Sequence, residues 1–284
     1  MVSLNKQFFT AIFVILSANS VFGWADMGHK LVGGIAEEVM SPDAKNMVRG
    51  ILGIEPLAVA AIFPDQVRDD ARFGTKTDPL VPGSEIHDFS PFHFCEVPVG
   101  YTYGNNLRKV EKDCHSAMKY TLDLIKNPKM PRETKMIALR YLVHVVGDIH
   151  QPFHIGNGFD RGANGCQVLT HTGVRVNLHA YWDENIVDFY RESLAQKGKS
   201  APKYFGDVLK ALKVKRAEMF SEKAKQAAGA GSLVDWISES QNLREGLYPD
   251  KPEDIAKAVK GEEYKSRPYC VWFVDQNKDE DRNF

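Results

Sequence analysis

The chain has 284 residues, of which 43% are hydrophobic and 26% charged, and this ordinary globular composition excludes a disordered or collagen-like protein. The 36 basic residues nearly balance the 37 acidic ones, leaving a net charge of −1. That balance argues against a protein that holds nucleic acid through a broad basic surface. The unusual feature is the set of nine histidines, because several of them have the spacing of metal ligands.

The first 23 residues have the pattern of a secretory signal peptide. Lys6 supplies the basic start, residues 8–16 form a short apolar segment, and Val21 and Gly23 stand at positions −3 and −1 of a cleavage site. A membrane anchor is the alternative, but a bilayer span needs about 20 apolar residues and this segment has about half that number. We therefore predict cleavage between Gly23 and Trp24 and export to the periplasm or the cell exterior.

From residue 24 onward the chain shows mostly helical periodicity, with one domain over residues 24–284 and no internal repeat. Residues 29–40 place apolar side chains on one helical face. Ser41 and Pro42 then form the N-cap and first position of a second helix, which is expected to end at Leu52 because Gly53 follows. Further helices are predicted over residues 64–71, 115–126, 133–149, 179–194, 202–212, 216–228 and 233–247.

Two polar loops that contain glycine are predicted at residues 72–90 and 156–164. A β-hairpin is predicted over residues 166–178, with its turn at His171-Thr172-Gly173. The sequence therefore predicts an all-α fold, a single mostly helical domain with a minor β-hairpin.

The four cysteines all lie after the predicted cleavage site. An even number of cysteines in an exported chain predicts up to two disulfides, and the three possible pairings stay open. The cysteines are Cys95, Cys114, Cys166 and Cys270.

Two His-x-x-x-Asp pairs carry the strongest chemical signal: His144 with Asp148, and His179 with Asp183. Side chains at i and i+4 project from the same face of a helix, so each pair could reach a single cation. Either pair alone is more simply read as a surface ion pair that supports a helix. His144 lies in an apolar run, however, where an unpartnered imidazole would be costly, and this context favours zinc.

Further candidate ligands surround these pairs in the sequence. His154 follows Pro152, where the helix over residues 133–149 must already have ended. The sequence also offers Asp65, His93 and, close to the predicted new N-terminus, His29. A free α-amine and a backbone carbonyl can chelate a metal together, so cleavage before Trp24 would complete a site.

Together these motifs resemble the zinc-dependent single-strand-specific nucleases, a family that includes mung bean nuclease, fungal nucleases and plant bifunctional nucleases. The resemblance extends from Trp24 to about Pro249 and weakens afterwards. The motifs that carry it, in order, are Trp24 with Gly28-His29, PDxxR at 64–68, HF at 93–94, HxxGDxHQPxH at 144–154, DRGxNG at 160–165 and NLHxxWD at 177–183.

The resemblance implies a helical fold of the phospholipase C and single-strand nuclease type around three Zn²⁺ ions. One ion would be held by Asp65, His93, His144 and Asp148, and a second by the Trp24 amine and carbonyl, His29 and the shared Asp148. The third would be held by His154, His179 and Asp183. A hydroxide bridging the close pair would attack phosphorus, and the third ion would stabilise the departing 3′ oxygen.

The resemblance also assigns roles to residues that bind no metal. Arg68 occupies the position of a transition-state arginine or lysine, with a surface helix arginine as the alternative. Glu96 stands where some members have an aspartate, and it would act as a base or orient a water. Phe94 would stack on a nucleobase or pack in the core, and Asp160 and Asn164 would contact the substrate or support the ligands.

The function implied is that of an exported, monomeric endonuclease and 3′-nucleotidase, without a stable protein partner. Its substrates would be single-stranded DNA, RNA and 3′-nucleotides, cut to leave 5′-phosphates. One alternative is a zinc phospholipase C, but that group ends its last His-x-x-x pair in Glu, whereas this chain has Asp183. A second alternative, from another class, is a secreted zinc-binding protein without catalysis.

Overall fold

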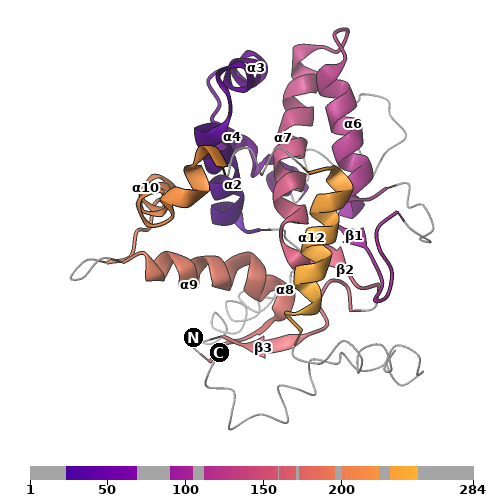
Figure 1. Cartoon of the computed structure of the whole chain (residues 1–284), viewed down its shortest axis with the longest axis vertical. Coiled ribbons are helices and arrows are strands. Elements are labelled where there is room, and N and C mark those ends of the chain that lie inside the picture. Colours follow the sequence, from indigo (N-terminus) through magenta and orange to yellow (C-terminus); the bar gives the residue numbers. More distant parts are fainter. Residues whose placement is uncertain are drawn as a thin grey trace, which may run out of the picture.

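Helix α7 (Arg132–Ile149) runs through the middle of the fold, and helices on several of its sides pack against it (Figure 1). Its neighbours are α2, α3, α4, α5 and α6, together with α12 and the short helices η1 and η2. The computed structural model describes residues 24–68, 90–104, 112–158, 160–170, 173–195, 200–223 and 231–248. The predicted signal peptide, the loop over 72–89 and the chain after residue 248 lie outside these ranges.

The described elements are mostly helices, as predicted. The α-helices besides α7 are α2 (Asp26–Val39), α3 (Pro42–Leu52), α4 (Leu57–Ala60), α5 (Phe63–Arg68), α6 (Cys114–Lys126), α8 (Leu178–Ala180), α9 (Ile186–Ser193), α10 (Phe205–Lys215) and α12 (Leu233–Glu245). The 3₁₀-helices are η1 (Ser90–His93), η2 (Pro152–His154) and η4 (Ala217–Phe220), and η3 (Tyr181–Asn185) is a π-helix. The strands are β1 (Cys95–Glu96), β2 (Ile155–Gly156), β3 (Gln167–Leu169) and β4 (Arg175–Asn177).

Local sequence signals explain where several helices begin and end. The Ser41 hydroxyl accepts a hydrogen bond from the Ala44 amide at 3.2 Å, and Pro42 opens α3 as predicted. Gly53 ends α3 with a φ of 72°, a left-handed conformation that glycine adopts readily. The predicted boundaries of α6 and α7 are likewise correct to within one residue.

The predicted hairpin is present as the antiparallel pair β3–β4, while part of its turn, residues 171–172, lies outside the described ranges. Several features differ from the predictions. Helix α2 begins three residues earlier and α10 lies three residues later than predicted, and the short helix α4 was not predicted. The helix expected over 179–194 contains the π-helix η3, and the helix expected over 216–228 begins as the 3₁₀-helix η4. The parallel pair β1–β2 was not predicted, because its two strands of two residues each are about 60 positions apart and too short to show a pattern.

Apolar clusters on two sides of α7 leave its third side for polar residues. Leu139 and Val143 pack with α3, α4 and α6 on one side, and Val145 and Ile149 pack with α6, α12 and the β1–β2 pair on another. His144 and Asp148 are fully buried on the remaining face. The packing of the hydrophobic core therefore fixes where these two polar side chains point.

Covalent and polar links hold the β1–β2 pair beside this face. A disulfide joins Cys95 of β1 to Cys114 at the start of α6, with 5.5 Å between the Cα atoms, and Cys166 is also disulfide-bonded. The buried Arg244 of α12 donates hydrogen bonds to the carbonyl oxygens of Val97, Ile155 and Gly156. These links fix the segments that follow His93 and His154.

Within the described part of the chain, no single helix is long and apolar enough to cross a membrane. One bent pair, α3 with residues 57–67, meets the length and composition test only when the two helices are taken together.

Candidate metal centre

The last two turns of α7 place His144 and Asp148 one above the other on the buried face. Their closest atoms, His144 Nε2 and Asp148 Oδ2, are 3.2 Å apart. Gly147 lies between them in sequence, and a Cβ atom there would lie 3.0 Å from Nδ1 of His29 on α2. Glycine at this position therefore lets α2 approach α7 closely enough for His29 to reach Asp148.

Three other elements each bring one more candidate ligand to Asp148 and His144. His29 Nε2 lies 3.3 Å from Asp148 Oδ1, and His93 Nδ1, from η1, lies 2.9 Å from Asp148 Oδ2. Asp65 Oδ1, from α5, lies 3.7 Å from His144 Nε2. We call these five residues the α7 group: His29, Asp65, His93, His144 and Asp148.

The loop group, as we name it, consists of His154, His179 and Asp183. His154 ends η2, His179 lies in α8 and Asp183 lies in the π-helix η3. His179 Nε2 is 3.3 Å from Asp183 Oδ2, and His154 Nε2 is 4.0 Å from Asp183 Oδ1. π-Helical turns often occur at functional sites, and here one sets the direction of a carboxylate.

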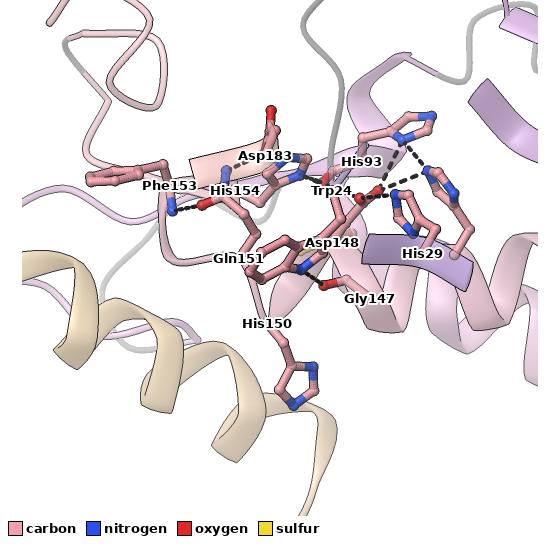
Figure 2. A network of polar contacts seen from close by, with 12 residues as sticks. Trp24, His29, His93, Gly147, Asp148, His150, Gln151, Phe153, His154 and Asp183 are labelled. Carbon is pink, nitrogen blue, oxygen red and sulfur yellow. Dashed lines mark hydrogen bonds and ion pairs between the residues drawn. The ribbon is translucent and has the colours of Figure 1, made fainter. Parts of the chain in front are cut away.

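Among the described residues, three sets of His and Asp have donor atoms that all lie within 4.8 Å of one another. Two sets come from the α7 group and share His144, and the third is the loop group. Zinc takes imidazole and carboxylate ligands at about 2.0–2.2 Å, so separations of this size suit ligands of one ion. Figure 2 shows His29 and His93 turned toward Asp148, whereas the exposed His150 points away from it.

Backbone carbonyls orient three of the imidazoles. Nδ1 of His144 donates a hydrogen bond to the Ala61 carbonyl, and Nδ1 of His154 donates to the carbonyl of His93. Nδ1 of His179 donates to the Gly162 carbonyl at 2.6 Å. In each case the bonded nitrogen carries the proton, so Nε2 is the nitrogen that can accept a metal.

Some buried nitrogens of the site have no hydrogen-bond partner among the described residues. They are Nδ1 and Nε2 of His29 and Nε2 of His154. A buried polar atom without a partner costs about 1–3 kcal/mol, so such atoms need an explanation. A cation coordinated by Nε2 of His29 and Nε2 of His154 explains two of these atoms, and the donor set of imidazole and carboxylate suits zinc.

Burial and neighbouring charges shift the pKa values within the α7 group. Burial acts to lower the pKa of His144, but the carboxylates of Asp148 and Asp65 outweigh it and raise the pKa to about 9. Burial acts to raise the pKa of Asp148, yet His144 and His154 hold it well below its usual range. The charge of Asp148 thus attracts a proton to His144, and a cation bound there would displace that proton.

The loop group has the opposite electrostatic balance. Burial lowers the pKa of His154 to about 4, so its imidazole is neutral at pH 7, as a metal ligand must be. Burial also raises the pKa of Asp183 well above its usual range, although the hydrogen bond from Gln151 opposes that change. A cation in the loop group would favour the ionised form of Asp183.

Trp24 and Ala25 make contacts beside both groups. The Trp24 indole donates a hydrogen bond to the Gly147 carbonyl at 2.9 Å, next to Asp148. The amide of Ala25 donates to the carbonyl of Asp183 at 3.1 Å. The residue predicted to become the N-terminus is therefore held between the α7 group and the loop group (Figure 2).

The predicted catalytic and stacking residues lie close in sequence to candidate ligands but have different surroundings. Arg68 is the last residue of α5, and its side chain lies outside the described part of the structure. Phe94 is half-buried directly after His93. The Glu96 carboxylate accepts a hydrogen bond from the Gly158 amide at 2.7 Å, and burial raises the pKa of Glu96.

The predicted substrate residues Asp160 and Asn164 belong to a tightly bonded loop. The buried Asp160 carboxylate accepts hydrogen bonds from the Ala163 amide at 2.9 Å and the Tyr248 hydroxyl at 2.8 Å. The Asn164 side chain donates to the carbonyl of Arg161. Both side chains thus stabilise the loop whose Gly162 carbonyl orients His179.

The sequence-based interpretation gave no role to the backbone of this loop or to Gln151. Arg161, Gly162 and Ala163 all have φ values of 60–64°, a left-handed conformation that is unfavourable for residues other than glycine. The signal available in the sequence was the glycine-rich motif at 160–165 and the glutamine between His150 and Pro152. Neither pattern specifies a side-chain contact without the fold.

Comparison with known proteins gives a consistent family. A model of the family described as S1/P1 Nuclease matches residues 24–272. The chain is 28% identical to Nuclease S1 of Aspergillus oryzae over 203 residues, which cover 68% of this chain and 63% of that protein. It is 24% identical to Endonuclease 2 of Arabidopsis thaliana over 272 residues (84% and 86%), and 29% identical to Nuclease P1 of Penicillium citrinum over 170 residues (56% and 57%). The match therefore spans less than two thirds of Nuclease S1 and most of Endonuclease 2.

Proposed function

Because the chain belongs to the S1/P1 nuclease family, we propose that it is a hydrolase of phosphodiester bonds that uses three zinc ions to cleave single-stranded DNA and RNA. The observation that supports the proposal most strongly is the convergence of two neighbouring ligand sets and a third one on adjacent elements. Buried imidazole nitrogens without hydrogen-bond partners among the described residues support it further.

We assign the ligands from the residues that the fold brings together. Asp65, His93, His144 and Asp148 hold one ion, and His29, Asp148 and the amine and carbonyl of Trp24 hold its neighbour. His154, His179 and Asp183 hold the third. When bound, the ions supply an activated water at neutral pH and positive charge opposite the phosphate oxygens.

The protein residues orient these ligands and the substrate. Asp148 contacts His29, His93 and His144 within 3.3 Å, so its carboxylate fixes the spacing of the α7 group. Arg68, three residues after Asp65, pairs with the phosphate in the transition state. Phe94, next to His93, stacks on a base, and such a contact contributes about 1–3 kcal/mol.

Preference for single strands follows from the same arrangement. For a phosphate to reach the buried ligands, the neighbouring base must leave its stack. Unstacking costs less in a single strand than in a duplex. The near-zero net charge of the chain is compatible with this chemistry, because the ions, rather than a broad basic surface, supply the positive charge.

Export and processing belong to the proposal. Cleavage after Gly23 frees the Trp24 amine at a point held between the two ligand groups. The Cys95–Cys114 disulfide fits an oxidising compartment such as the periplasm or the cell exterior.

The test uses the purified chain that begins at Trp24, incubated with single-stranded DNA, RNA, double-stranded DNA and phosphatidylcholine vesicles. Each reaction is run with and without a chelator, and zinc is then added back. We expect oligonucleotides with 5′-phosphate ends from the single strands, loss of cleavage with the chelator and recovery with zinc. Hydrolysis of the lipid alone would favour a phospholipase C, and zinc binding without turnover would favour a non-catalytic zinc protein.

A further inference from the structure

Gln151 is a fully buried residue two positions after the end of α7, outside both ligand groups but in contact with residues of both. Its backbone amide donates a hydrogen bond to the Asp148 carbonyl at 2.9 Å. It is also the N-cap of η2, the 3₁₀-helix that ends in His154. Figure 2 shows it between Asp183, Phe153 and the end of α7.

Both polar atoms of the Gln151 side chain have a defined partner. Oε1 accepts a hydrogen bond from the Phe153 amide at 2.6 Å, and Nε2 donates to Asp183 Oδ1 at 2.7 Å. The Phe153 amide can only donate and the Asp183 carboxylate accepts, so the two partners fix which end of the amide faces which group. If the amide were flipped, its NH₂ group would face the Phe153 amide N–H and its oxygen would face the Asp183 carboxylate, so both hydrogen bonds would be lost.

This arrangement fixes Asp183 without competing for its charge. With Oδ1 bonded to Gln151, Oδ2 is the oxygen that faces His179 Nε2, at 3.3 Å. An arginine or lysine at this position would neutralise the carboxylate, and a glutamate would repel it. A neutral amide orients the carboxylate and leaves its negative charge for a cation.

We propose that Gln151 is the positioning residue of the third zinc ion, because its amide holds Asp183 and the η2 turn that carries His154 in one arrangement. The inference rests on the proposed function, since it concerns the affinity of an ion that the proposed function requires. Gln151 itself binds neither zinc nor substrate. Through its bond to the Asp148 carbonyl, it also sets where the loop group lies relative to the α7 group.

The test compares zinc binding by the chain starting at Trp24 and by two variants. Gln151→Glu keeps the acceptor for Phe153 but replaces the donor to Asp183 by a second carboxylate. Gln241→Glu is the matched control, because Gln241 is also buried and donates one hydrogen bond at 2.6 Å, to the Tyr101 carbonyl, away from both ligand groups. Zinc per chain is measured by mass spectrometry of the metal after dialysis over a series of buffered free-zinc concentrations.

We expect Gln241→Glu to bind three ions, each with the same affinity as in the unchanged chain. In Gln151→Glu, one of the three ions should require about 10–100-fold more free zinc, and saturating zinc should restore hydrolysis. Gln151→Met removes both bonds without adding a charge and should show the same selective loss, which keeps the test valid if the glutamate variant does not fold.

Three ions bound with unchanged affinity in the variants of Gln151 would overturn its positioning role and leave the proposed function intact. Equal weakening of all three ions, or a loss of activity that saturating zinc does not restore, would show a general structural role and overturn it as well. An unchanged chain that binds fewer than three ions would contradict the proposed function itself.

Discussion

The α7 group and the loop group have the same kinds of side chains but are built on different kinds of backbone. In the α7 group, α-helices supply four of the five candidate ligands and the 3₁₀-helix η1 supplies His93. His29 stacks on His144 with ring centroids 3.8 Å apart. In the loop group, the ligands come from a 3₁₀-helix, a short helix and a π-helix. Gln151 and the Gly162 carbonyl hold them from outside. Side-chain spacing on α-helices therefore specifies most of the α7 group, whereas backbone detail specifies the loop group.

The largest effect is expected from Asp148→Asn, which removes the charge shared by the neighbouring ions. Losing several kcal/mol of electrostatic stabilisation should lower kcat/KM at least about 1,000-fold, with loss of zinc from the α7 group before the loop group. Asp113→Asn is the matched control, because Asp113 is also buried but caps α6 and accepts from Tyr103 instead. Metal content and nuclease rates are measured together, and retention of three ions by Asp148→Asn would refute the shared-ligand assignment.

An extra residue before Trp24 is expected to have the next largest effect. It moves the amine away from the α7 group, so activity should fall about 100-fold or more while the fold is kept. Trp24→Phe provides the control, since it keeps the amine and removes only the indole bond to Gly147. Single-strand cleavage by chains with these defined N-termini gives the answer, and full activity of the extended chain would show that the amine is no ligand.

Gly162→Ala should disturb the loop group and spare the α7 group. A Cβ atom there would lie 2.4 Å from the Phe153 carbonyl oxygen, which is a steric clash. The φ of 62° at this position is also unfavourable for alanine. We expect a loss of about 1–3 kcal/mol in the free energy of unfolding and release of one zinc ion before the other two. Gly173→Ala has a similar φ of 79° and open space around the new Cβ, so it measures the conformational cost alone. Equal zinc loss in both variants would argue against a specific link from Gly162 to His179.

The smallest effect concerns Glu96, which lies in β1 outside both groups. Because burial raises its pKa, the folded chain binds this proton more tightly than the unfolded chain, and the stability cost appears as the pH rises above the ordinary value for glutamate. Glu96→Gln should therefore melt a few degrees higher than the unchanged chain at pH 8 and at the same temperature near pH 4. If Glu96 also serves as a base or orients water, nuclease activity should fall in the same variant, and unchanged activity would limit its role to the bond with Gly158.

The sequence was sufficient to predict the parts of the molecule that depend on local patterns. Ser41, Pro42 and Gly53 specify α3 through capping, and the i, i+4 spacing of His144 and Asp148 places both on one face of α7. The close approach of His29 at Gly147 and the β1–β2 pair depend on contacts between distant segments, which no local pattern records.

The loop group was harder to predict for a further reason. The π-turn at Asp183 and the left-handed backbone at Arg161 and Ala163 are conformations that these residue types adopt rarely on their own. The surrounding structure imposes them, as expected where strain is retained for a function. The candidate ligands could be named from the sequence, but the hydrogen bonds that orient them could not.

The most direct test of the account is a crystal structure of the chain starting at Trp24, grown with zinc and measured on both sides of the zinc absorption edge. Anomalous difference maps should show three peaks, two beside Asp148 in the α7 group and one between His154, His179 and Asp183. A map without a peak in the loop group, or with a single peak beside Asp148, would contradict the proposed three-zinc centre.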